Sequence, residues 1–242
     1  MTNAFYLARN ESIVPLKIGL NLTYDEVASS YPETLYEDLA TKLVSRFGLD
    51  LRISKCFDHG IKAVIKGRSF HYLHEISSPT KIFMLLHTLG HYQFITRAAR
   101  LGIQRYDYIY ETSEDGDAHV YRYRAASGGG PVVTPKILCD RIEFEVRAND
   151  FAVETARALG LGQLVPLIRL YEPADIRYII DVMDGGVDAI VSDRDYVEGY
   201  VLSGLGVPQQ HNEEKIFDRR FFSVEDIDWE LLRTRKIEIH FL

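Results

Sequence analysis

Two histidines four residues apart in an apolar segment constrain this chain more than any other feature. Residues 81–91 read K-I-F-M-L-L-H-T-L-G-H, and this apolar run predicts a buried helix. The spacing places His87 and His91 on one face of that helix, one turn apart, where both imidazoles can bind one metal ion. The segment therefore predicts a buried helix that carries two metal ligands.

The residue after the first histidine determines which reaction such a helix supports. The zinc-peptidase pattern H-E-x-x-H has a glutamate there, and this glutamate is the general base. Here the position is occupied by Thr88, whose hydroxyl cannot act as a general base near neutral pH. The helix therefore predicts a metal site and leaves open whether the protein is an enzyme.

A third ligand is expected on a second helix, predicted from about residue 134 to residue 160. Catalytic zinc takes three protein ligands and keeps a fourth position open. Glu145 is the best candidate because it shares a helix face with Ala148 and Asn149, whereas the competing Glu143 does not. A small Ala148 would let the two helices approach closely, and Asn149 could hydrogen-bond a ligating imidazole.

The order of these motifs, F-x-L-L-H-x-L-G-H and then E-x-x-A-N-x-F-A, resembles the ImmA/IrrE family of bacterial and phage zinc-peptidase-like regulators, a branch of the zincin group. The resemblance covers roughly residues 35–160. It implies that His87 and His91 are the imidazole ligands of one Zn²⁺ ion and that Glu145 is the carboxylate ligand. It also implies that Asn149 occupies the supporting polar position.

The same resemblance implies an α+β, zincin-like fold with a small antiparallel or mixed sheet packed on the metal-binding helices. A metal-binding domain is expected over residues 1–165, with a Tyr- and Gly-rich insertion at about 103–135. Residues 166–242 are expected to form a mainly helical accessory region. The resemblance does not explain this last third of the chain.

The expected function is that of a pseudoenzyme, because Thr88 stands where the family has its general base. Such a protein would act in bacterial stress or phage biology by binding a protein partner, for which a transcription regulator is the candidate. The alternative is an active zinc-dependent peptidase or hydrolase with an atypical base, for which Glu75 is the candidate. Two histidines and a carboxylate also describe a non-haem iron site, but such triads usually lie on a β-barrel.

Composition excludes several other classes of protein. The formal net charge of −7 argues against direct nucleic-acid binding. Cys56 and Cys139 lie far apart without a C-x-x-C spacing, so a reducing cytoplasm is expected. No apolar run approaches the roughly 20 residues that span a bilayer, and no signal peptide is visible at the N-terminus.

Local patterns predict the remaining elements. Thr23 and Glu26 form a capping-box pattern at a helix start, and Gly48 is expected to end a second helix. Ser78 is the expected N-cap of the histidine helix, with Pro79 in its first position. The expected elements are the second helix at 33–47, strands at 51–57 and 61–73 (the latter one strand, or two broken at Gly67), helices at 173–183 and 193–203, and a strand at 236–242.

Overall fold

The computed structural model describes residues 22–55, 63–103, 135–183, 192–203, 224–235 and 237–241, which together form an α+β fold. The insertion predicted at about 103–135 therefore lies almost entirely outside the described residues. In chain order the elements are α1 (Tyr24–Ser30), α2 (Glu33–Phe47), β1 (Asp50–Ser54), β2 (Ala63–Lys66), β3 (Ser69–Leu73), α3 (Ser78–Arg100), α5 (Pro135–Ala158), the 3-10 turn η3 (Gly162–Leu164), α6 (Val165–Met183), α7 (Asp193–Tyr196), the π-helical turn η4 (Val197–Val201), the 3-10 turn η6 (Val224–Asp226), α8 (Trp229–Thr234) and β4 (Glu238–Phe241).

The first two helices begin and end where the sequence predicts. The Thr23 hydroxyl accepts a hydrogen bond from the Glu26 backbone N–H, and the Glu26 carboxylate accepts one from the Thr23 backbone N–H at 2.7 Å. This capping box satisfies two backbone groups that a helix start would otherwise leave exposed. Gly48 ends α2 at a φ of 65°, a left-handed conformation that glycine adopts without strain.

A four-stranded mixed sheet supports the helices, in the order β1-β3-β2-β4. The pair β1 and β3 is parallel, and the other two pairs are antiparallel. The long strand predicted at 61–73 is two strands, and Gly67 between them has a φ of 55°. Strand β4 pairs with β2, so residues from both sides of the predicted boundary at 165/166 share one sheet.

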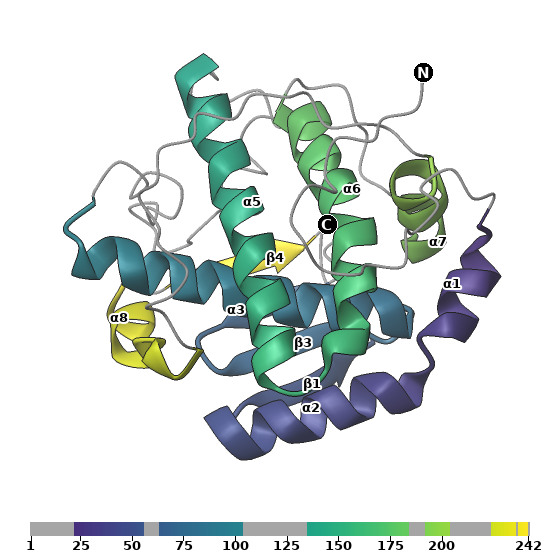
Figure 1. Ribbon diagram of the computed structural model, residues 1–242, viewed down its shortest axis with the longest axis horizontal. Coiled ribbons are helices and arrows are strands. Elements are labelled where there is room, and N and C mark those ends of the chain that lie inside the picture. Colours follow the sequence, from purple (N-terminus) through teal and green to yellow (C-terminus); the bar gives the residue numbers. More distant parts are fainter. Residues whose placement is uncertain are drawn as a thin grey trace.

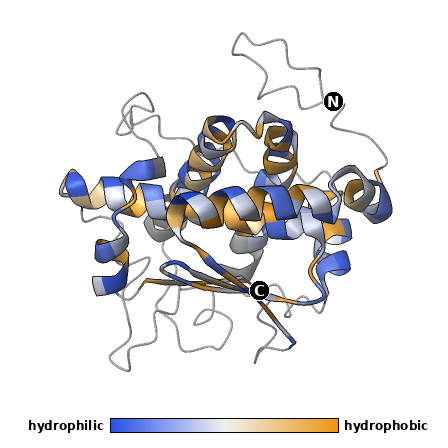
Figure 2. Ribbon diagram, turned by 90° about the horizontal axis from the view of Figure 1, so that it is seen from below, coloured by the Kyte–Doolittle hydropathy of each residue, from blue (hydrophilic) through white to orange (hydrophobic). Residues whose placement is uncertain are grey.

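Helix α3 is the centre of the molecule. It has 23 residues, and every residue from Ser78 to Thr96 is buried, as expected of a helix surrounded by other elements. Its N-cap is Ser77, one residue earlier than predicted, and Pro79 lies in the first turn. The sheet lies on one side of α3, and α5 and α6 cross it on the other side (Figures 1 and 2). None of the helices in the described part of the chain is long and apolar enough to cross a membrane.

Helix α6 corrects one prediction, because it begins at Val165 and not at Pro173. Pro166 is its second residue, where a missing backbone N–H costs nothing. Pro173 lies inside the helix, a position that costs roughly 3 kcal/mol in an isolated helix. Packing offsets this cost, since Leu167 and Tyr171 are fully buried in the main core.

Candidate metal centre

The two helices that carry the predicted ligands meet at Gly90 and Ala148. A Cβ atom built on Gly90 would overlap the carbonyl oxygen of Ala148 and lie 2.7 Å from its carbonyl carbon. Only glycine fits at this distance, so α3 and α5 come into backbone contact there. Gly90 directly precedes His91, and the contact therefore places α5 against the turn of α3 that carries both histidines.

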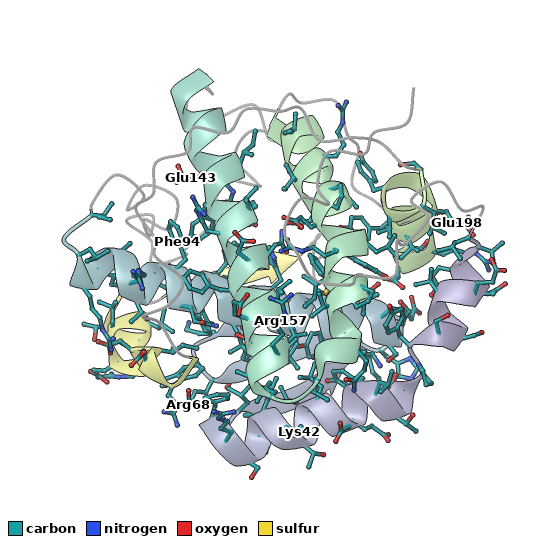
Figure 3. All side chains as sticks on the ribbon, in the orientation of Figure 1. Lys42, Arg68, Phe94, Glu143, Arg157 and Glu198 are labelled. Carbon is teal, nitrogen blue, oxygen red and sulfur yellow. The ribbon has the colours of Figure 1, made fainter. Side chains whose placement is uncertain are left out.

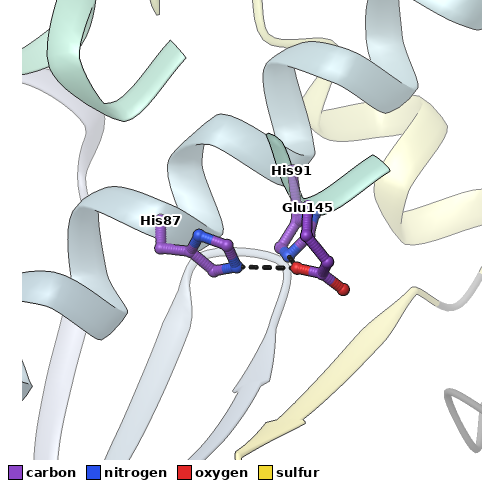
Figure 4. A group of neighbouring side chains, drawn as sticks. All are labelled: His87, His91 and Glu145. Atoms are coloured by element: carbon purple, nitrogen blue, oxygen red, sulfur yellow. Dashed lines mark hydrogen bonds and ion pairs between the residues drawn. The ribbon is translucent and has the colours of Figure 1, made fainter. Parts of the chain in front are cut away.

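The three predicted ligands converge at this crossing (Figure 4). The Glu145 Oε2 atom lies 3.0 Å from His87 Nε2 and 3.0 Å from His91 Nε2. One nitrogen from each imidazole and one carboxylate oxygen lie within 4.8 Å of one another. All three side chains are buried, none more than 1% exposed. This group could bind a metal ion.

Asn149 occupies the supporting position that the sequence predicts. Its Oδ1 atom lies 2.8 Å from His87 Nδ1. A carbonyl oxygen only accepts, so His87 donates from Nδ1 to Asn149, and without a metal its Nε2 donates to the Glu145 carboxylate; loss of that second proton frees Nε2 for a metal. Asn149 thus sets the imidazole tautomer that a metal bound at Nε2 requires.

Replacing Asn149 with alanine is expected to weaken zinc binding by about 10–100-fold, because the ring of His87 loses the group that orients it. Asn149→Asp keeps an acceptor oxygen at the same place and should retain most of the affinity. Competition against a chelator of known zinc affinity measures both constants. Equal zinc affinity in Asn149→Ala and the wild type would remove this role.

Burial and neighbouring charges hold Glu145 and His91 in forms that bind metal, whereas His87 would have to release a proton on binding. Burial alone would raise the pKa of Glu145, but the Arg141 guanidinium, 2.7 Å from Oε1, and hydrogen bonds from the two histidines lower it well below its usual range. Burial lowers the pKa of His91 to about 3. Burial also opposes protonation of His87, but Asp175 and Glu145 outweigh it and raise that pKa. At neutral pH Glu145 is therefore an anion and His91 is neutral, as ligation requires.

Aromatic rings enclose the two imidazoles. Phe83 stacks on His87 with ring centroids 5.0 Å apart, and Phe144 stacks on His91 at 4.3 Å. These apolar walls lower the local dielectric, which strengthens the attraction between a cation and the Glu145 carboxylate. The donor set of two imidazoles and one carboxylate is one that zinc sites use, so the residues present fit that ion.

The remaining predicted positions, Thr88, Glu75 and Glu143, are not members of the ligand group. Thr88 is fully buried, and its hydroxyl has no hydrogen-bond partner among the described residues. Glu75 is exposed in the turn that follows β3, and the structure does not bring it into the ligand group. Glu143 lies on the side of α5 that faces away from α6 (Figure 3), and the ligand group contains Glu145 instead.

The sequence patterns did not predict one residue beside the ligands, Asp175. The Asp175 Oδ2 atom, from α6, lies 3.6 Å from His87 Nε2, and Asp175 is only 3% exposed. A signal for it exists, because Asp175 lies four residues after Tyr171 and three before Tyr178, both of which are buried. An acidic residue on the core face of a helix indicates a charged partner within the core.

Comparison with known proteins identifies no relative: no family model, curated protein or solved structure matches this chain. The metal centre is therefore assigned from its own residues. Its donors, its burial and the close contact at Gly90 all come from two helices whose motifs are visible in the sequence.

Proposed function

We propose that this chain is a zinc-binding protein with an ImmA/IrrE-like, zincin-like scaffold that has lost the standard peptidase reaction. One observation carries the proposal. His87, His91 and Glu145 converge in a buried group, while the position of the general base is occupied by Thr88. The scaffold for a metal is present, and the residue that would perform proton transfer is absent.

Each residue of the centre has a defined part in holding zinc. His87 and His91 would supply neutral nitrogens, and Glu145 would supply one negative oxygen. Asn149 orients His87, and Arg141 keeps Glu145 ionised. Bound zinc would supply Lewis acidity, and in this centre it would also fasten α3 to α5, because the ligands come from both helices.

Thr88 cannot supply the general base on which the standard peptidase reaction depends. A positioned general base typically contributes about 10²–10⁴-fold to such reactions. Thr88 offers a neutral hydroxyl at that position, and its side chain is completely buried. The proposed protein therefore acts through binding. Its net charge of −7 favours a protein partner over nucleic acid, and we propose a transcription regulator in the bacterial cytoplasm as that partner.

Restoring the glutamate tests this proposal. Thr88→Glu should gain peptidase activity on an unfolded protein substrate, with a rate about 10²–10⁴-fold above that of the wild type. Thr88→Gln has the same size without a base and should stay inactive. Zinc content and circular dichroism establish that both variants bind metal and fold. Hydrolysis by the wild type that is abolished in Glu145→Ala would contradict the proposal.

A second candidate function is favoured by Asp175. In an active zinc-dependent hydrolase, a carboxylate beside the metal ligands would accept a proton from the attacking water. Asp175 is such a carboxylate, 3.6 Å from His87 Nε2, whereas the predicted base Glu75 is exposed. In this case Asp175→Asn would lose hydrolysis and keep its zinc.

A further inference from the structure

We propose that Asp175 is a fourth protein ligand, which closes the coordination sphere of the zinc centre. This inference rests on the proposed zinc site and defines what kind of site it is. A centre with four protein ligands is structural, whereas a catalytic centre keeps one position open. Asp175 would thus be a second obstacle beside the missing base, and the gain of activity expected in Thr88→Glu would then require Asp175→Ala in the same protein.

The position of Asp175 relative to His87 carries the inference. His87 Nε2 faces two carboxylate oxygens, Glu145 Oε2 at 3.0 Å and Asp175 Oδ2 at 3.6 Å. Donor atoms that share one tetrahedral zinc ion lie roughly 3.3 Å apart, given zinc–donor bonds of about 2.0–2.1 Å. Both separations are close to this value. Asp175 lies outside the group of donor atoms within 4.8 Å of one another, so its side chain would have to move toward His91 and Glu145 when the metal binds.

Burial and charge favour the same assignment. Asp175 and Glu145 are both buried, at 3% and 0% exposure. A divalent cation between two carboxylates is neutralised by them, which offsets the cost of burying all three charges. With two neutral imidazoles, the four donors carry two negative charges, which match the charge of Zn²⁺. Because Arg141 also lies against Glu145, a single carboxylate would leave two positive charges in the buried centre, and Asp175 reduces this to one.

A ligand on α6 would connect a third helix to the metal centre. Helix α6 packs against both α5 and α3, and its Asp175 carboxylate lies 3.6 Å from His87 Nε2. With Asp175 as a ligand, zinc would join α3, α5 and α6. Removal of zinc should then loosen α6, a helix that the three-ligand centre does not fasten.

Cobalt substitution with azide as an added ligand tests the inference. Co²⁺ occupies zinc sites, and its visible spectrum changes when azide enters an open position. The wild-type cobalt protein should show no azide-dependent change, because protein side chains fill every position. Asp175→Ala should show a clear change, and its zinc dissociation constant should rise at least about 10-fold.

Two further variants make the result specific. Asp175→His restores a fourth donor, and the visible spectrum of its cobalt form should again not change when azide is added. Glu154→Gln removes a solvent-accessible carboxylate of α5, one that binds Arg157 at 2.9 Å outside the ligand group, and should behave as the wild type. If Asp175→Ala does not fold, the isosteric Asp175→Asn replaces it.

The possible outcomes are distinct. An azide-dependent change in the wild type would overturn the fourth-ligand inference and leave the zinc site itself intact. Absence of an azide-dependent change in Asp175→Ala, or in Asp175→Asn where that variant replaces it, would also overturn the inference. A wild type that binds neither zinc nor cobalt would overturn the proposed function together with this inference.

Discussion

Replacing His87 with alanine is expected to abolish stoichiometric zinc binding. The wild type should hold one zinc ion per chain, and the variant should bind zinc at least about 100-fold more weakly. Loss of a ligand costs more than loss of a supporting residue, which itself costs about 10–100-fold. His87 is the imidazole that contacts both buried carboxylates, Glu145 and Asp175.

The same variant separates zinc binding from folding. The wild type should melt at a lower temperature in the presence of a chelator, because an ion that binds only the folded state stabilises it. His87→Ala should melt at a temperature that the chelator does not change. His74→Ala is the matched control, since His74 is exposed outside the ligand group and should not affect zinc binding. Full zinc content in purified His87→Ala would contradict the assignment of this ligand.

Replacing Gly90 with alanine is expected to cause the largest loss of stability of any single-methyl change in the centre. The added Cβ would lie 2.7 Å from the carbonyl carbon of Ala148 and 2.9 Å from its Cα. Both atoms belong to backbone, so no side chain can move aside, and α3 and α5 must separate. Overpacking of this kind typically costs about 1–3 kcal/mol, and backbone contact favours the upper end. Separation of the helices should also weaken zinc binding.

Urea unfolding of Gly90→Ala measures this effect. Gly162→Ala serves as the control, because a Cβ on Gly162 meets nothing within 4 Å, and its free energy of unfolding should change by no more than about 0.5 kcal/mol. Both proteins should be compared without zinc and with zinc. A free energy of unfolding within about 0.5 kcal/mol of the wild type in Gly90→Ala would show that the helices do not meet as described.

The group of two histidines and one glutamate could be predicted from the sequence because each residue lies in a short periodic motif. The spacing of His87 and His91 fixes their common face on any helix, and Glu145 shares a face with Ala148 and Asn149. The structure brings the three ligands together and places Asn149 on His87. The Thr23 capping box and the Gly48 helix end were predictable for the same reason, since both are local.

The features that escaped prediction depend on contacts between distant segments. The spacing of Asp175 to Tyr171 and Tyr178 places it on the core face of α6, but only the packing of α6 shows that it lies beside His87. The helix start predicted at Pro173 concealed the longer helix from Val165, and with it the core face that contains Asp175. The sequence does not distinguish Gly90 from other small residues, because its contact with the Ala148 backbone appears only in the structure. The pairing of β4 with β2 likewise joins segments far apart in the chain.

The central claim, that His87, His91 and Glu145 hold one zinc ion, is tested most directly by anomalous diffraction at the zinc edge. The crystals should come from protein purified without chelators. We expect one peak per chain, about 2.0–2.2 Å from a nitrogen of each histidine and an oxygen of Glu145. A map without a peak at this position, with the two imidazoles still hydrogen-bonded to the Glu145 carboxylate, would contradict the claim.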